Sequence, residues 1–393
     1  MKRARALRLF RLVSLVALCS LAGVGCKKPP PAWSHPMPWS AARPERALDA
    51  PGIRGVTIGP IENALHPSVG YGTPAYAREL DECVRFGATW VAITPFGRVA
   101  NLDGTGIDPT FETPYELNFP RVLTAISMAH DRGLKVFLVP HLWVESGEWR
   151  ALIDPKTDAG WARWAASYER YVVGWARVAE AGQAEMFSAG VELRSWVTTA
   201  RASSFLDVIH SIRREYHGLL TYSANWDDVD RTVILGELDL IGINAFYPLA
   251  DHDGATSSEL LAGGQVVRDK VHALSEAWHR PVLFTEIGYT TRSDPAVKPW
   301  EWPDAMHDVH VDEEAQAEAY RGLIAPVLEE PDFAGFFVWR VYSDPDDVSQ
   351  EAEWGFSPKG KLAELVMRDA FAARWVGEDR GWGSRARVPG VAP

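Results

Sequence analysis

The chain has 393 residues, of which 47% are hydrophobic and 23% charged, and this composition excludes a disordered protein. A formal net charge of −12 argues against a nucleic-acid partner, because phosphate binding requires a basic surface. The sequence contains 17 tryptophans, an unusually high number, and tryptophan rings form flat platforms for sugars, bases or cations. With a negatively charged protein, sugars are the expected ligands.

The first 25 residues have the pattern of an export signal. Basic residues precede an apolar segment at 12–24, which ends in Gly-Val-Gly followed by Cys26. This arrangement resembles a bacterial lipoprotein signal, in which the cysteine is lipidated and becomes the new N-terminus. A plain secretory signal, with Cys26 incidental, is the alternative. We therefore predict an exported protein that a lipid at Cys26 anchors to the cell envelope, without a membrane-spanning segment.

The rest of the chain divides into a tether, one domain and a tail. Residues 26–50 are rich in proline and alanine and predict an extended tether. Residues 51–375 form the predicted domain, and 376–393 lack periodicity and predict a tail. Cys83 is the one cysteine left in this domain, so its core rather than disulfides must stabilise it.

Eight short apolar segments recur through the domain and predict buried parallel strands. They are 52–59, 89–96, 135–143, 185–193, 219–225, 238–246, 281–289 and 333–342. Helical patterns lie between most of them, at 76–86, 120–132, 161–181, 203–217, 265–278 and 313–329. Eight strands that alternate with helices over about 325 residues predict a single-domain α/β fold, the (β/α)8 TIM barrel. The rival, a doubly wound open sheet, usually has a glycine-rich turn after its first strand, which is missing here.

The active site of such a barrel lies at the C-terminal ends of its strands. Glu192 ends the fourth predicted strand and Glu286 the seventh, so the two face each other across the mouth. Two carboxylates that flank one bond are the catalytic groups of glycoside hydrolysis. One donates a proton, and the other attacks the sugar or activates water. The alternative is that each glutamate only pairs with a rim arginine, such as Arg194 or Arg340.

Other polar and aromatic residues at the strand ends are candidates for binding sugar hydroxyls and faces. They are His141, Trp143, Asn225, Trp226, Tyr247 and Trp339, each of which also has a plain packing or turn-forming interpretation. The loop at 97–119 and the insert at 292–311 are expected to wall the cleft. In that insert, His307 and His310 resemble metal ligands, but no third ligand is identifiable and we favour a solvated loop. We predict neither a metal nor a cofactor.

Several motifs resemble glycoside hydrolase family 113, a β-mannanase-type family of the clan A TIM-barrel glycosidases. The matching segments extend from Gly55 to about Leu362. The most specific are FSAGVEL at 187–193, PVLFTEIGY at 281–289 and GFSPKGK at 355–361. The resemblance implies that Glu192 is the acid/base and Glu286 the nucleophile of a retaining mechanism, with β-mannan as the leading substrate.

Two positions depart from the expected pattern. Val191 stands where many clan A enzymes have an asparagine before the acid/base, and Arg340 where another aromatic residue is expected after Trp339. These differences concern substrate contacts rather than catalysis. A second hypothesis keeps the barrel but not the activity: a carbohydrate-binding surface lipoprotein that has lost catalysis.

Overall fold

The computed structural model describes residues 52–59, 68–108, 115–303, 306–346 and 351–380. The predicted signal peptide, Cys26, the tether and residues 381–393 of the predicted tail lie outside these ranges. Within them, no helix combines the length and apolarity needed to cross a membrane.

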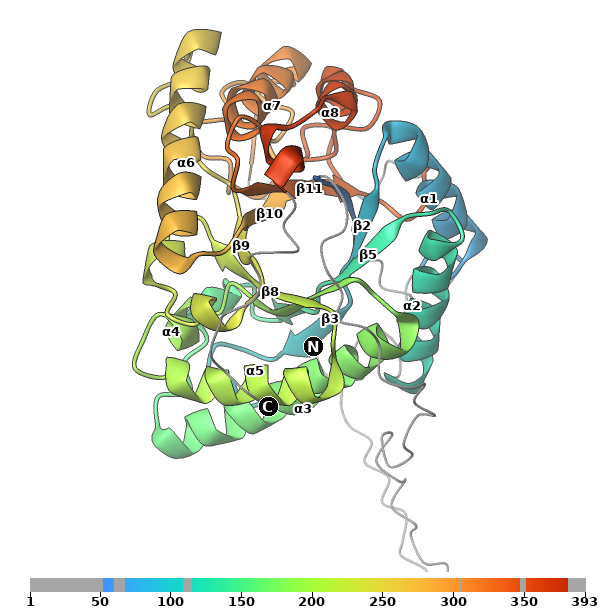
Figure 1. Ribbon diagram of the computed structural model, residues 1–393, viewed down its shortest axis with the longest axis vertical. Helices are drawn as coiled ribbons and strands as arrows, with labels where there is room; N and C mark the ends of the chain where they lie inside the picture. Colours follow the sequence, from blue (N-terminus) through green and yellow to red (C-terminus); the bar gives the residue numbers. More distant parts are fainter. Residues whose placement is uncertain (1–51, 60–67, 109–114, 304–305, 347–350, 381–393) are drawn as a thin grey trace, which may run out of the picture. The chain divides into compact units, whose positions relative to one another are not determined.

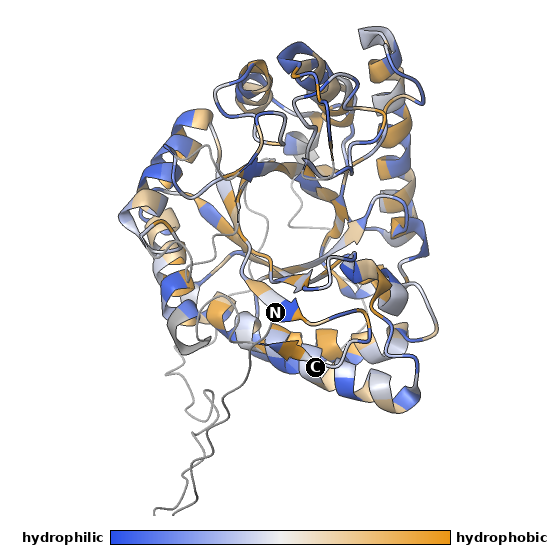
Figure 2. Ribbon diagram, turned by 180° about the vertical axis from the view of Figure 1, so that it is seen from behind, coloured by the Kyte–Doolittle hydropathy of each residue, from blue (hydrophilic) through white to orange (hydrophobic). Residues whose placement is uncertain are grey.

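Eight of the strands close into a parallel barrel in the spatial order β1-β11-β10-β9-β8-β7-β5-β2. Their bounds are β1 Ile53–Ile58, β2 Trp90–Ile93, β5 Lys135–Leu138, β7 Met186–Val191, β8 Leu219–Asn225, β9 Ile241–Asn244, β10 Val282–Ile287 and β11 Phe333–Val341. Figure 2 shows these strands as a closed ring with the helices outside it. The predicted (β/α)8 barrel is confirmed, and the open doubly wound sheet is excluded.

The helices cover the outside of the barrel (Figure 1). Their bounds are α1 Pro74–Phe86, α2 Tyr115–His130, α3 Asp158–Gly182, α4 Arg194–Val197, α5 Ala202–Glu215, α6 Ser257–Trp278, α7 Glu313–Val327 and α8 Leu362–Ala372. Short 3-10 turns are η1 Arg150–Leu152, η2 Val229–Arg231, η3 Leu235–Glu237 and η5 Val376–Arg380. Helix α8 lies in a segment where the sequence pattern predicts no helix, and η5 lies in the segment predicted as tail.

The apolar strand residues explain why the barrel closes. Inward-facing side chains from all eight strands or their ends form one buried cluster, which includes Trp90, Phe137, Met186, Leu283 and Phe337. Removing this surface from water stabilises the fold by about 25 cal/mol per Å² of apolar area. The strands are buried on both faces because the helices pack on their outer side, which is why they are apolar nearly throughout.

A second, smaller sheet extends the barrel beyond β2 and β5. It contains β3 Phe96–Val99, β4 Ile107–Asp108 and β6 His141–Val144, with β3 between the other two. The sequence pattern predicts β6 as the end of one strand at 135–143. The structure divides that segment at Pro140, as it divides β2 from β3 at Pro95. Proline has no N–H to donate to a ladder, so each strand stops there and restarts in the second sheet.

Helix ends and close helix contacts hold the outer layer. The Thr256 side chain and Glu259 form a reciprocal capping box at the start of α6. Further along α6, Gly264 lies so close to α7 that a Cβ atom would be 1.9 Å from the carbonyl oxygen of Gly322. The two glycines therefore allow α6 and α7 to pack backbone to backbone.

The tryptophans divide between core and cleft. Trp161, Trp164 and Trp175 of α3 are buried, as their helical spacing predicts. Trp196 is buried in α4 and packs edge-on against Phe205 at a centroid distance of 5.0 Å. The excess of tryptophan thus serves the packing of the helix layer as much as the mouth of the barrel.

Candidate active site

A cavity of about 970 Å³ opens at the C-terminal ends of the barrel strands. Its wall combines acidic, basic and aromatic side chains from the strand ends, the second sheet and the loop after β10. The lining residues that concern the chemistry are Phe96, Arg98, His141, Trp143, Trp149, Arg150, Glu192, Asn225, Trp226, Phe246, Glu286, Trp300, Trp302, Trp339, Arg340 and Phe356. Both glutamates predicted to be catalytic face this one cavity.

Glu192 directly follows β7 and has a positive φ of 52°, a backbone conformation that costs energy for any residue other than glycine. Its amide donates to the Ser223 carbonyl oxygen at 2.9 Å, which holds the residue in this conformation. The carboxylate accepts from Trp149 Nε1 at 2.8 Å and lies 3.0 Å from Arg150 Nη2. These contacts aim a nearly buried carboxylate into the cavity.

Glu286 lies within β10 and is also nearly buried. Burial raises the pKa of its carboxyl well above the usual range, and the negative charge of Glu192 raises it further. The positive charges of Arg150 and Arg340 act in the opposite direction. The site therefore favours a proton on Glu286, whereas Glu192 pairs with Arg150.

One amide group lies between the two carboxylates. Asn244 ends β9, donates from Nδ2 to Glu192 Oε1 at 3.1 Å, and also contributes a hydrogen-bonding interaction that lowers the pKa of Glu286. Its own Oδ1 accepts from Thr285 Oγ1 at 2.8 Å, which fixes the NH2 group toward the acids. One side chain thus acts on both carboxylates.

His141 completes the centre of the cavity. Its Nε2 lies 3.4 Å from Glu286 Oε1, and its ring stacks between Phe96 and Trp339 at centroid distances of 5.0 Å and 5.9 Å. Burial lowers the pKa of His141 well below its usual range, and nearby arginine charges lower it further. The imidazole is therefore neutral at physiological pH and offers one donor and one acceptor nitrogen.

Exposed tryptophans surround this centre. Trp143 is 42% exposed on β6, and Trp300 is 47% exposed in the insert after β10. Trp300 stacks on Trp226 with centroids 5.3 Å apart and an interplanar angle of 25°. Aromatic faces that stay open to solvent beside a polar cleft are suited to stacking on sugar rings. Trp300 and Trp302 confirm that the insert walls the cleft. Of the described residues of the predicted loop at 97–119, Arg98 alone lines the cavity, and it lies in β3.

The structure brings together every predicted site residue of the domain except Tyr247. That residue is buried outside the cavity, with its ring 5.7 Å from Trp226 and 6.1 Å from Phe284. Its neighbour Phe246 lines the cavity instead, because consecutive side chains of an extended segment point in opposite directions. The prediction that Tyr247 contacts the substrate is therefore corrected.

Sequence reasoning missed Arg150 and Asn244 as partners of Glu192. Asn244 is the last residue of its strand, so the rule that placed the glutamates would also have found it. Arg150 lies in η1, and no local pattern connects it to β7. The alternative that a strand-end glutamate pairs with Arg194 does not occur. Arg194 pairs with Asp228 at 2.6 Å rather than with Glu192.

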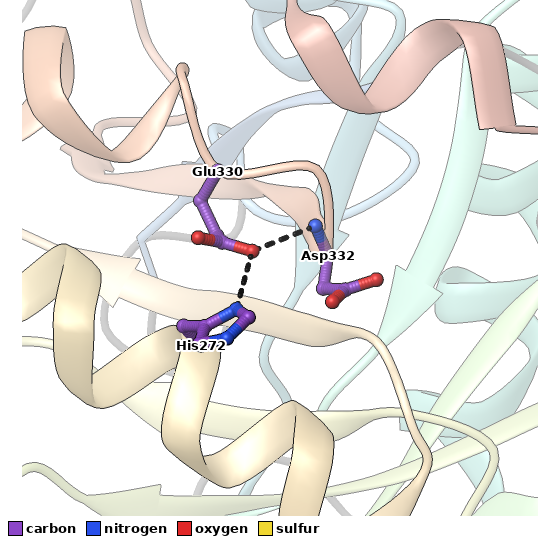
Figure 3. A group of neighbouring side chains, drawn as sticks. All are labelled: His272, Glu330 and Asp332. Atoms are coloured by element: carbon purple, nitrogen blue, oxygen red, sulfur yellow. Dashed lines mark hydrogen bonds and ion pairs between the residues drawn. The ribbon is translucent and has the colours of Figure 1, made fainter.

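A group of potential metal ligands lies away from this cavity, at the loop that leads into β11 (Figure 3). Glu330 Oε1 accepts from the Asp332 amide at 3.2 Å and lies 3.3 Å from His272 Nδ1. These bonds tie α6 to the start of β11 and account for the arrangement. His307 and His310 lie beside a smaller cavity and belong to no such group within the described ranges.

Comparison with known proteins identified the same family as the sequence motifs. The model of Glycoside Hydrolase Family 113 matches residues 65–361. The structure resembles a GH113 β-mannanase, AaManA from Alicyclobacillus acidocaldarius, with a TM-score of 0.70 and 25% identity over 83% of this chain and 99% of that one. A second GH113 β-1,4-mannanase matches with a TM-score of 0.70 and 23% identity, over 82% of this chain and 100% of that one.

A more distant structure shares the fold alone. It is a family 5 mannosidase from Rhizomucor miehei, with a TM-score of 0.57 and 10% identity over 86% of this chain and 96% of that one. A search among curated proteins found no match.

Proposed function

The chain belongs to glycoside hydrolase family 113, and on this premise we propose that it is a retaining endo-β-mannanase that uses Glu192 and Glu286. The chain is a glycoside hydrolase by its family. The mannan specificity follows from the β-mannanases that it resembles over more than four fifths of its length.

The observation that carries the mechanism is that Glu192 and Glu286 line one cavity, where the charge of Glu192 raises the pKa of Glu286. Two carboxyls that flank one bond supply the proton donor and the nucleophile of a glycosidase. The resemblance to family 113 implies the retaining mechanism, a double displacement.

In the first step Glu286 attacks the anomeric carbon while Glu192 protonates the departing glycosidic oxygen. In the second step Glu192 removes a proton from water, which attacks the glycosyl-enzyme and releases Glu286. The pair must carry one proton in total at the start. The raised pKa of Glu286 favours this proton on Glu286, so the reaction needs the proton to move to Glu192 when substrate binds.

The surroundings of the pair support a sugar chain as substrate. Trp339 is buried at the centre beside His141. Farther out, Trp143 lies on β6, and Trp226 and Trp300 lie on loops that follow β8 and β10. A chain that crosses the cavity would meet aromatic faces on several sides of the cleavage point. This distribution is suited to cleavage within a polysaccharide.

The proposal is tested by hydrolysis of manno-, gluco- and xylo-oligosaccharides, with Glu192→Gln and Glu286→Gln as matched variants. We expect manno-oligosaccharides to be cleaved with the β-anomer as first product, observed by proton NMR, and each variant to lose at least about 1,000-fold in kcat. Binding without cleavage by the unmodified protein would favour the alternative of a carbohydrate-binding lipoprotein. Full activity in either variant would overturn the role of that glutamate.

We also propose export and lipid attachment at Cys26, on the sequence pattern of residues 1–26. Incorporation of a labelled fatty acid by expressing cells, with Cys26→Ser as control, tests this. Equal labelling of the variant would overturn the assignment.

A further inference from the structure

One cation in the cavity has no carboxylate partner among the described residues. Arg98 pairs with Glu145 at 3.1 Å, and Arg150 pairs with Glu192 at 3.0 Å. Arg340 also lines the cavity, yet it forms no ion pair within the described ranges. In a chain with a net charge of −12, a cation left unneutralised in the substrate cavity calls for an explanation.

The position of Arg340 is built by aromatic rings. Its guanidinium lies 5.2 Å from the ring centroids of both Trp302 and Trp339 and 4.9 Å from that of Tyr342. The rings offset part of the cost of removing the cation from water and hold its plane in one orientation. The side chain is half-buried, and its Nε is buried without a hydrogen-bond partner in the described parts of the chain.

Glu351, which bonds to Tyr342 beside Arg340, already has other partners. Glu351 accepts from the Tyr342 hydroxyl at 2.7 Å and from the backbone amides of Phe356 and Ser357. Arg340 is therefore left facing the cavity, close enough to the catalytic pair to lower the pKa of Glu286. An acidic group on the substrate would reach it beside the cleavage point.

We propose that Arg340 forms a subsite for a sugar carboxylate, so that the enzyme prefers β-linked chains that carry uronic acid residues next to the bond it cleaves. The planar guanidinium matches a carboxylate in geometry and charge and can bind it through two parallel hydrogen bonds. The proposal rests on the proposed glycosidase function of the same cavity and specifies its substrate class. Arg340 stands where the resemblance to family 113 implies an aromatic residue, and this difference introduces the charge.

Binding of matched oligosaccharides tests the proposal. The probes are β-1,4-mannotetraose, the β-1,4-tetramannuronate that carries carboxylates at C6, and the methyl ester of the latter, which keeps the shape without the charge. Affinities are measured by calorimetry in the Glu286→Gln protein, so that no probe is consumed. We expect the charged probe to bind about 10- to 100-fold more tightly than its ester, because hydrogen bonds between ions are the strong ones. Added salt should reduce this ratio.

Two further variants in the same background assign the preference to one residue. Arg340→Met should bring the ratio of charged to esterified probe close to one. Arg98→Met, which removes a cavity arginine that already has a partner, should leave the ratio in place. The proposal is overturned by an absence of preference, by a preference that survives Arg340→Met, or by one that disappears in Arg98→Met instead. An equal loss for both probes in Arg340→Met overturns it as well, since Arg340 would then act only through its neighbours.

The outcome is separable from that of the proposed function. Hydrolysis of neutral mannotetraose by the unmodified protein tests the mannanase assignment and does not involve the charged probe. A preference that depends on Arg340, together with no cleavage of mannotetraose, would keep the carboxylate subsite and reject mannan as the substrate. Cleavage of mannotetraose without the charge preference would do the reverse.

Discussion

Replacing Asn244 with aspartate tests whether one amide supports the two carboxylates that we propose to be catalytic. The change keeps the shape of the side chain and replaces its NH2 donor with an oxygen. In the native site that donor lies 3.1 Å from Glu192 Oε1 and also interacts with Glu286, and the side chain is fully buried. Asn244→Asp therefore removes a hydrogen bond to a charged group and adds a third acid to the pair.

The size of the effect follows from these contacts. A hydrogen bond to a charged group contributes about 1.5–3 kcal/mol, and a loss of about 2 kcal/mol corresponds to roughly 30-fold in rate. Repulsion among three buried acids forces the introduced carboxyl to take up a proton, so its pKa is raised. While protonated it still donates one hydrogen bond. Activity should therefore be closest to the unmodified protein at acidic pH and fall as the pH rises through this raised pKa.

The assay is kcat/KM for mannotetraose over the acidic to neutral range, with thermal unfolding to verify the fold. Asn225→Asp is the matched control, because Asn225 lines the same cavity but donates to Asp227 at 2.6 Å rather than to the catalytic pair. We expect the shift in pH profile for Asn244→Asp alone. Unchanged kcat/KM and pH profile in Asn244→Asp, or an equal shift in the control, would refute the bridging role of this amide.

Burial and close packing lead to three further predictions. On the proposed mechanism the catalytic pair needs one proton in total, and the raised pKa of Glu286 is the one at which this proton is lost. We therefore expect kcat/KM to fall as the pH rises through that raised value, and a pH–rate profile whose alkaline limb lies near the ordinary glutamate value of about 4.3 would contradict this. Burial raises the pKa of Glu79 to about 7 against its ion pair with Lys359, so the folded state binds the proton more tightly than the unfolded state. The contribution of Glu79 to the free energy of unfolding should fall by about 3 kcal/mol between acidic and neutral pH. Urea unfolding of Glu79→Gln should show no such decrease with pH, and an equal decrease in the variant would refute the prediction. Gly264→Ala would place a methyl group 1.9 Å from the Gly322 carbonyl oxygen and should destabilise the protein by about 1–3 kcal/mol. An unchanged melting temperature would contradict this prediction and show that α6 and α7 can separate freely.

The repeating pattern of apolar segments was sufficient by itself to predict the barrel. All eight predicted strands are present, and β8 has the predicted bounds of 219–225. Parallel strands buried on both faces must be apolar throughout, so each one is visible in the sequence as a continuous apolar segment. The same pattern placed Glu192 and Glu286 at strand ends, where a charged residue after an apolar run is conspicuous.

Only the tertiary structure decided how the site is completed. Arg150 is 42 positions from Glu192, and Trp300 is 74 positions from the Trp226 ring on which it stacks. No periodicity connects such residues, because loops that follow different strands meet only when the barrel closes. Whether Phe246 or Tyr247 lines the cavity likewise depended on the direction of the chain after β9. Local patterning of polar and apolar residues records which face is buried, whereas the partners of each charge are set by contacts between distant segments.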